Sequence, residues 1–452
     1  MNFPLRHLCL GASISVLLLA ASPIAGAEGL RSVVGKTLGS NPELSALASN
    51  RLAIDEELEA AKGISGPTVD VKAAAGYAWT SQLKDNGIDP GFEDETGRVE
   101  LSGVIQLPVF DGWKTYYEVE RNAYRVESAR FRVSDTANSL ALQAIQTYLE
   151  IQRANAVVAI SEKNVRAHRS YLSRVQTRVA GGSAAEAEMI QARPRLAAAD
   201  AALIEAQARL QDAFAAYLAV VGEPPGKLEP VGAPRYLPAS VQTAVEDAVS
   251  FAPSLNALSN DVAAAQSAIG TAEAEFYPKV NVEIAGDHTV DSDVDFSDES
   301  NFTALLVVKK NLYNGGVDTA RVREARHRAE QARQTAMNAQ RQIEKEVRLS
   351  WMAMRSAKER QVVLRRQLDH NRALVVAYGK QFDLGQRSLM DILDVQNEIF
   401  TTETTLASES FSGTFNSYRV LAATGKLLEA LDLGLPDEAT RVADQERRLA
   451  IP

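Results

Sequence analysis

The sequence predicts a mixed α/β membrane protein in which several copies of one chain build a shared β-barrel that long helices continue. Three observations predict it: the chain repeats itself, each half contains two alternating strands, and each half contains a very long helix. Four strands cannot close a barrel, and lipid does not tolerate an open sheet edge. Three copies would supply about twelve strands, which is within the range of outer-membrane barrels.

The amino-acid composition excludes several classes of protein. The chain has 452 residues, of which 46% are hydrophobic, 23% charged and 6% aromatic. This balance excludes a polytopic helical membrane protein and wholesale disorder. A formal net charge of −10 argues against a nucleic-acid partner. The single cysteine, Cys9, excludes disulfide scaffolds and thiolate metal sites. Because the sequence has no nucleophile elbow, phosphate loop or metal-ligand cluster, we predict no enzyme, no cofactor and no metal site.

Residues 1–27 have the pattern of a secretory signal peptide. Arg6 and His7 form a short basic start, an apolar stretch covers 8–21, and Ala25 and Ala27 form an A-x-A cleavage site. Cleavage after Ala27 would leave a mature chain that begins with glutamate. An uncleaved membrane anchor is the alternative, but the apolar stretch is short for a membrane span.

The rest of the chain divides into two structural repeats at an offset of roughly 203–211 residues. Four segments are expected: a first repeat at 28–222, a proline-rich linker at 223–240, a second repeat at 241–430 and a polar tail at 431–452. The tail is expected to be loosely held after Pro436. The clearest copy is residues 41–47, which recur as 252–258. Each repeat is therefore expected to contain a helix, two strands and a long helical hairpin.

Four segments alternate between apolar and polar residues, which is the pattern of strands with one apolar face. They lie at about 68–82, 97–110, 278–288 and 300–313. In the second, Val99, Leu101 and Ile105 share one face while Glu100 and Ser102 share the other. Each is about ten residues long, the length that crosses a bilayer in a barrel. A half-buried sheet in a soluble protein has the same period and is the alternative.

Two long helical hairpins are expected at about 113–222 and 315–430. No proline or glycine lies between Trp113 and Gly181, so this helix could be about 100 Å long. Apolar residues repeat every seven positions in both arms of the first hairpin, which imposes left-handed supercoiling. They are Ile151, Val158, Val165, Leu172 and Val179, then Met189, Leu196, Leu203, Leu210 and Tyr217, joined by Ala192, Ala199, Ala206 and Ala213. Simple two-helix packing is the alternative, but it does not need helices of this length.

These features resemble the TolC-like outer membrane factors over roughly 30–430. The resemblance is carried by the two-fold repeat, the strand-to-helix junction at 107–112, its weaker copy at 311–316 and the hairpin at 382–396. It implies a homotrimer whose transmembrane β-barrel has about twelve strands, four from each chain, continued by a coiled-coil α-helical barrel in the periplasm. It also implies the outer membrane of a Gram-negative bacterium, a periplasmic membrane-fusion adaptor and an inner-membrane transporter.

Within this family, residues 41–44, 60–71 and 220–224 are most similar to members that serve type I secretion. The cargo would be a large adhesin or RTX-like protein, and the transporter an ABC transporter. The alternative is the outer membrane component of a multidrug or small-molecule efflux pump with a proton-driven transporter. A second alternative is a periplasmic coiled-coil structural protein without a pore, which alternating strands beside acidic loops at 83–96 and 287–300 disfavour.

Two aspartates in the second hairpin indicate a gate. Asp391 and Asp394 are three residues apart, so they share a helix face. In a trimer about six carboxylates would crowd the three-fold axis and attract cations. The resemblance implies that they ring the periplasmic entrance, and that Arg387 braces the closed state against an acid on the other hairpin, where Glu188 stands. The tyrosine that is usual in this network corresponds here to Phe382, which lacks the hydroxyl.

The same segment also has a structural explanation. Ser388 followed by Asp391 resembles a capping box, which would start the return helix of the second hairpin. Ser183 followed by Glu186 predicts the same box in the first hairpin. Capping leaves Asp394 unexplained, and the two roles are compatible.

By resemblance, the adaptor docks on the two hairpin tips, at Gly182, Ser183, Gly385 and Gln386. A solvated turn is the alternative, because Gly385 suits a left-handed helix end. Four aromatic residues near the strand ends would form an interfacial belt in outer membrane lipid: Trp113, Tyr116, Tyr117 and Tyr313. Packing at the junction between sheet and helices is the alternative for these.

Overall fold

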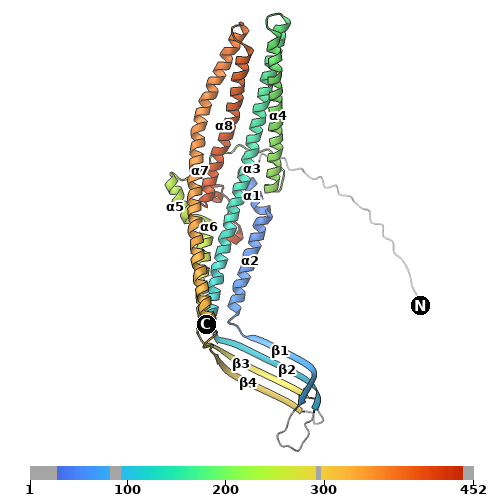
Figure 1. Cartoon of the computed structure of the whole chain (residues 1–452), viewed down its shortest axis with the longest axis vertical. Helices are drawn as coiled ribbons and strands as arrows, with labels where there is room; N and C mark the ends of the chain where they lie inside the picture. Colours follow the sequence, from blue (N-terminus) through green and yellow to red (C-terminus); the bar gives the residue numbers. More distant parts are fainter. Residues whose placement is uncertain (1–27, 82–92, 292–296, 441–452) are drawn as a thin grey trace, which may run out of the picture.

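The computed structural model describes residues 28–81, 93–291 and 297–440. The molecule is a long rod of helices with a sheet at one end and two helical hairpin tips at the other (Figure 1). The predicted signal peptide at 1–27 lies outside the described residues, as do parts of the acidic loops and the last residues of the tail. Within the described ranges, no helix combines the length and the hydropathy needed to cross a bilayer.

The sheet takes two strands from each repeat. Its strands are β1 (Thr68–Ser81), β2 (Glu93–Phe110), β3 (Lys279–Asp291) and β4 (Ser297–Lys309). They are antiparallel in the order β1-β2-β3-β4, so the pairing of β2 with β3 joins the two repeats. The outer edges of β1 and β4 have no partner strand among the residues described.

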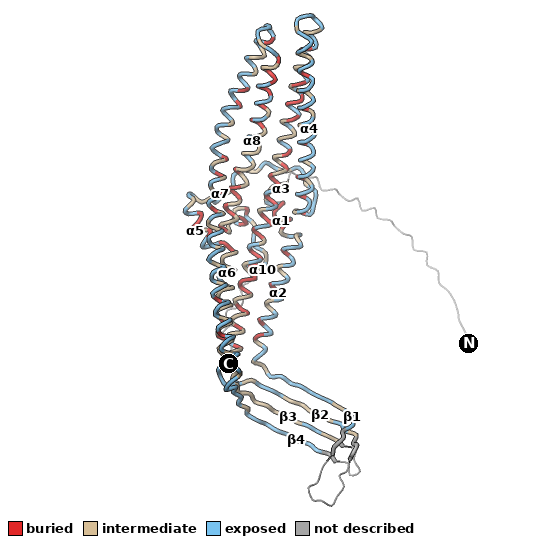
Figure 2. The backbone as a smooth tube through the Cα atoms, viewed as in Figure 1, coloured by how far each residue is buried: buried red, intermediate tan, exposed pale blue. Residues whose placement is uncertain are grey.

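The two faces of the sheet differ in polarity. Side chains that pair directly across strands share a face. On one face the apolar residues are open to the surroundings, with Val71 74%, Phe302 77% and Leu306 67% exposed. On the other face Lys72 pairs with Ser102, which pairs with Asp287. This alternation is the predicted pattern, and no described helix packs on the sheet, whose strands extend away from the helical rod (Figure 2).

The helical part contains two long hairpins and two shorter helix pairs. The long hairpins are α3 (Lys114–Ala180) with α4 (Glu186–Val221), and α7 (Val317–Asp383) with α8 (Leu389–Ala423). The shorter pairs are α1 (Leu30–Ser40) with α2 (Pro42–Gly63), and α5 (Val241–Phe251) with α6 (Pro253–Glu273). A short 3₁₀ turn, η1 (Ala274–Phe276), leads into β3, and α9 (Leu427–Ala430) and α10 (Asp437–Thr440) follow the second hairpin.

The repeat seen in the sequence is a repeat of structure. The matching segments 41–47 and 252–258 both start a helix with proline at its first position, Pro42 in α2 and Pro253 in α6. Both return helices run to a glycine with positive φ, Gly222 (85°) and Gly425 (71°). These residues allow the left-handed turn that ends each hairpin.

In the upper half the long helices lie side by side in the order α4-α3-α8-α7 (Figure 1). The predicted alanine stripe of α4 forms the seam with α3: Ala192, Ala199, Ala206 and Ala213 are 3–4% exposed. Small side chains let the two helix axes approach closely. In the lower half α2 and α6 pack on α3, and α6 also packs on α7.

Several strand ends differ from the sequence prediction by up to four residues, and two differences between prediction and structure have a clear physical cause. β4 ends at Lys309, because Asn311 Oδ1 accepts a hydrogen bond from Tyr313 N (3.1 Å) and turns the chain before the predicted strand end. The tail was expected to be loosely held after Pro436, which is wrong as far as Thr440, because α10 packs on α2 and α3. Leu431 and Ala439 are 8% and 1% exposed, because they complete the apolar cluster where the hairpins meet the lower helices.

Candidate functional site

The two hairpin tips are built alike. Both long helices end in a glycine with positive φ, Gly182 (70°) and Gly385 (74°). Ser183 N donates to the carbonyl oxygen five residues earlier (2.8 Å), and Gln386 N does the same (2.9 Å). Gly182 N and Gly385 N each donate to the carbonyl oxygen three residues earlier (3.0 and 2.9 Å), which completes the two bonds of a Schellman motif in each tip and confirms the predicted left-handed end at Gly385. All four predicted tip residues therefore lie in matching turns at one end of the molecule (Figure 1).

The return helices start differently. Asp391 N donates to the Ser388 hydroxyl (3.3 Å), and Ser388 N donates to Asp391 Oδ2 (3.3 Å), which confirms the predicted capping box of α8. The box predicted for Ser183 and Glu186 is wrong. α4 begins behind Ala185, so Ser183 lies two residues too early, and its hydroxyl donates to a backbone carbonyl of α3 (3.1 Å).

Arg387 makes its contacts inside its own hairpin. Its Nη1 lies 3.8 Å from Asp391 Oδ2, its Nε donates to Gln381 Oε1 (3.2 Å), and its guanidinium lies 4.3 Å from the centroid of the Tyr378 ring. Glu188 Oε2 is buried with no hydrogen-bond partner among the described residues. A single chain therefore does not bring Arg387 and Glu188 together.

Two ion pairs tie the two hairpins to each other near the tips. Arg195 Nη2 of α4 lies 3.0 Å from Asp394 Oδ1 of α8, and Arg174 of α3 pairs with Asp383 of α7. Asp394 is thus a paired carboxylate in the single chain. Sequence reasoning missed both arginines because no local pattern links them to their partners. The available signal was the separation along the chain, 199 and 209 residues, which is close to the repeat offset.

Phe382 fills the space between the hairpins. It is 1% exposed and packs with Val175 of α3 and Ile392 of α8. The guanidinium groups of Arg178 and Arg174 lie 4.4 Å and 5.5 Å from its ring centroid, and Arg178 Nη1 donates to its carbonyl oxygen (3.0 Å). Packing and two cation–π contacts therefore hold this position without a hydroxyl.

Both structural repeats match one family model. A model described as outer membrane efflux protein matches residues 33–223 and 244–426. The chain belongs to the outer membrane efflux protein family. The family consists of channel components of tripartite export systems and not of enzymes, which confirms the corresponding predictions.

Relatives and solved structures agree with this family assignment. The outer membrane efflux protein BepC of Brucella suis biovar 1 (strain 1330) is 24% identical over 342 residues, which are 75% of this chain and 74% of the relative. The fold is similar to that of the Campylobacter jejuni CmeC outer membrane channel, with a TM-score of 0.78, 14% identity and coverage of 92% of this chain and 90% of that one. VceC of Vibrio cholerae has a TM-score of 0.74, 16% identity and coverage of 90% and 97%. The predicted TolC-like fold is confirmed.

A third link between the hairpins of this efflux-family chain lies further from the tips. Glu403 of α8 accepts hydrogen bonds at Oε1 from Lys163 of α3 and Arg372 of α7, both at 2.7 Å. Burial alone would raise the pKa of Glu403, but the two hydrogen bonds and the two positive charges outweigh burial and lower the pKa. The carboxylate therefore stays ionised although its side chain is 9% exposed.

A buried histidine of α3 lies near Arg195, which forms one of the ion pairs between the two hairpins. His168 of α3 is 6% exposed, and its Nδ1 has no hydrogen-bond partner among the described residues. Burial, and then the positive charge of Arg195, lower the pKa of His168. The histidine is therefore held neutral beside one of the two ion pairs between the hairpins.

The structure separates the four predicted interfacial aromatics. Trp113, Tyr116 and Tyr313 are 53%, 44% and 84% exposed, where the helices meet the sheet. The ring of Tyr117 instead packs on α6 at Gly270. Only glycine leaves room for it there, because a Cβ at position 270 would lie 2.5 Å from the ring. Three of the four thus keep an exposed ring surface, although Trp113 also packs edge-on against Tyr277 (5.3 Å between ring centroids) and Tyr116 against Tyr117 (5.3 Å).

Proposed function

We propose that three copies of this chain assemble into the outer-membrane exit duct of a tripartite export system. The observation that supports it is the sheet: it has two open edges and one exposed apolar face. Joining β4 of one copy to β1 of the next would remove the open edges and place the apolar face in lipid, with about twelve strands in the closed barrel. The helical hairpins would continue the tube into the periplasm.

The proposed partners are a periplasmic membrane-fusion adaptor and an inner-membrane ABC transporter, in type I secretion of a large adhesin or RTX-like protein. The matching tip turns support adaptor docking, because they present two similar surfaces per chain. The segments at 41–44, 60–71 and 220–224 support the secretion branch. The second candidate is small-molecule efflux with a proton-driven transporter, which the similarity to a relative described as an efflux protein favours. The family assignment argues against the pore-free coiled-coil protein.

Quantitative proteomics of the culture medium and cell surface separates the two candidates. A clean deletion of the gene is compared with the wild type and with a complemented strain. Type I secretion predicts the loss of one large, acidic, repeat-rich protein that complementation restores. An unchanged secretome, with the candidate cargo expressed, would contradict secretion, and increased susceptibility to drugs and bile salts would then support efflux.

We propose that Asp391 and Asp394 line the periplasmic entrance and that Arg387 reaches Glu188 of a neighbouring copy. The buried, unpartnered Oε2 of Glu188 supports this, since a buried carboxylate oxygen is costly without a donor. Changing both aspartates to asparagine should raise single-channel conductance or weaken block by divalent cations. Ser388→Ala is the control, because it breaks the capping box and leaves the charges. Unchanged conductance and block in the asparagine variant would contradict the gate.

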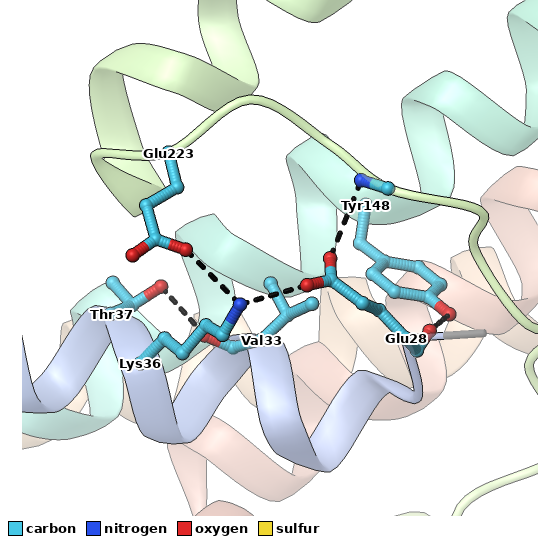
Figure 3. A network of polar contacts seen from close by, with 7 residues as sticks. Glu28, Val33, Lys36, Thr37, Tyr148 and Glu223 are labelled. Atoms are coloured by element: carbon cyan, nitrogen blue, oxygen red, sulfur yellow. Dashed lines mark hydrogen bonds and ion pairs between the residues drawn. The ribbon is translucent and has the colours of Figure 1, made fainter. Parts of the chain in front are cut away.

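Removal of the signal peptide after Ala27 is also proposed. Lys36 Nζ lies 2.8 Å from Glu28 Oε1 and 3.1 Å from Glu223 Oε2, and the Tyr148 hydroxyl oxygen lies 2.7 Å from the Glu28 carbonyl oxygen (Figure 3). These contacts support a mature chain that begins at Glu28, because they fasten that residue to α1, to α3 and to the start of the linker. N-terminal sequencing of the purified protein should read Glu28 first, and any other first residue would contradict the site.

The exposed aromatics support the proposed place of the membrane boundary. Trp113, Tyr116 and Tyr313 would lie in the lipid headgroup region next to the periplasm. Their fluorescence or accessibility to quenchers placed at the headgroup depth tests this directly. Quenching only by probes in the water phase would contradict it.

A further inference from the structure

A pocket of about 500 Å³ lies where α8 is flanked by α3 and α7. Both hairpins contribute to it, since α3 belongs to the first and α7 and α8 to the second. Its apolar lining residues are Ala159, Ile160, Leu368, Leu406 and Ala407. It is a shallow groove that is largely open to the surface, with a volume in the range of sites that hold small molecules.

Three cations line the same pocket. Lys163 and Arg372 both bond the one carboxylate of the pocket, Glu403, which fixes the positions of their charged ends. Arg365 makes no ion pair with any described residue and is exposed. Three positive charges and one negative charge leave the pocket with two uncompensated positive charges.

The combination of an apolar lining and excess positive charge defines a class of ligand. A small inorganic anion would match the charge and leave the apolar lining in water. A neutral apolar molecule would fill the lining and leave Arg365 without a counter-ion. Because a guanidinium binds a carboxylate or sulfonate in a bidentate manner, a ligand with both parts satisfies the whole pocket.

We propose that this pocket binds a small amphipathic anion, an apolar ring system that carries one carboxylate or sulfonate. Its apolar body would pack on Ile160, Leu368 and Leu406, and its anionic group would meet Arg365. Such a ligand touches both hairpins at once and stabilises their side-by-side packing. Binding is thus coupled to the relative position of the hairpins, whatever cargo the duct carries.

Saturation-transfer-difference NMR with the full chain in lipid nanodiscs tests the proposal. The probe is 2-naphthoate, and 2-naphthamide is the neutral probe of the same shape. The wild type should bind the carboxylate more tightly than the amide. Arg365→Gln should weaken carboxylate binding by up to about fivefold, the upper end of the range for one exposed charge pair. Arg366→Gln removes the same charge from the neighbouring exposed position outside the pocket lining and should have no effect.

Three results would overturn the proposal. One is saturation transfer with the wild type no larger than with empty nanodiscs of the same lipid. Another is equal loss of binding in the Arg365 and Arg366 variants, which would indicate attraction to the overall charge. The last is equal affinity for the amide and the carboxylate, which would leave only an apolar contact. None of these results bears on the assembly or cargo of the duct.

Discussion

The long helices α3 and α7 have the same length, 67 residues, and opposite surroundings. α3 lies between α4 and α8 in the half with the hairpin tips and packs on α2 and α6 in the half next to the sheet. Its apolar side chains are therefore covered along most of its length within the chain. α7 lies at the edge and leaves large apolar side chains uncovered: Leu349, Met352, Val362, Val363 and Val376, each 52–59% exposed. α3 therefore completes its packing inside one chain, whereas α7, like α4 with its exposed Ile190 (59%) and Ile204 (67%), leaves apolar side chains that no described part of the chain covers.

The largest expected effect comes from charging the uncovered side of α7. Leu349→Glu combined with Val363→Glu should abolish the trimer, because both carboxylates would be buried against the next copy at a cost of several kcal/mol each. The measurement is trimer content by heat-modifiable gel migration and native mass spectrometry. Lys358→Glu, at an exposed position of the same helix, is the control that should keep the trimer. A stable trimer in the double variant would break the comparison.

The next effect concerns the two tips. Phe382→Ala should destabilise the tip by about 3–5 kcal/mol, because it opens a cavity among buried residues. The equivalent position in the first repeat is Val179, which is half-buried, so Val179→Ala should cost much less. Hydrogen exchange of the tip amides measures both local effects. Equal changes in the two variants would mean that the tips share one environment.

A smaller effect distinguishes the starts of the return helices. Ser388→Ala should destabilise the first turn of α8 by about 1 kcal/mol, through the loss of the cap. Ala185→Ser should stabilise α4 by a similar amount, because Ala185 (φ −76°, ψ 143°) already has the backbone conformation of Ser388 (φ −74°, ψ 154°). Amide exchange in the two first turns reports the change. Unchanged amide protection in the first turn of α4 after Ala185→Ser would show that the serine does not cap this helix.

The smallest effect is a dependence on pH that one hairpin has and the other lacks. His168 of the first repeat corresponds to Asn371 of the second, which is also buried. Because the pKa of His168 is lowered in the folded chain, the unfolded chain binds the proton first. Stability is therefore fully present above the unfolded pKa of about 6.5 and is lost as the pH falls from there through the folded pKa. His168→Asn should remove this part of the pH dependence of thermal unfolding, and an unchanged profile would contradict it.

The features that repeat locally could be predicted from the sequence, and those that depend on distant partners could not. The alternation of the strands and the seven-residue repeat of apolar residues depend only on residues that are close in the sequence. The sheet and the α3–α4 seam could therefore be predicted. The pairing of Arg195 with Asp394 joins residues in different repeats. The position of the first N-cap depended on the length of a turn, which shifted it from Ser183 to Ala185. The packing of Ala439 was missed because its neighbours in the sequence, Glu438 and Thr440, are polar.

Disulfide cross-linking between β1 and β4 tests whether three copies of the chain share one barrel. The only cysteine of the sequence, Cys9, lies in the predicted signal peptide. Any disulfide in the mature protein would therefore form between the two introduced cysteines. Val71→Cys is combined in turn with cysteine at the positions of β4 that share its apolar face: Phe302, Ala304, Leu306 and Val308.

Within one chain β1 and β4 are three strand spacings apart, roughly 14 Å, which is too far for a disulfide. In a barrel shared by three copies, one of the four registers should yield a covalently closed trimer that stays together after heating in detergent and separates on reduction. Chains that remain monomeric in all four registers, or that stop at linked dimers, would contradict a barrel shared by three copies.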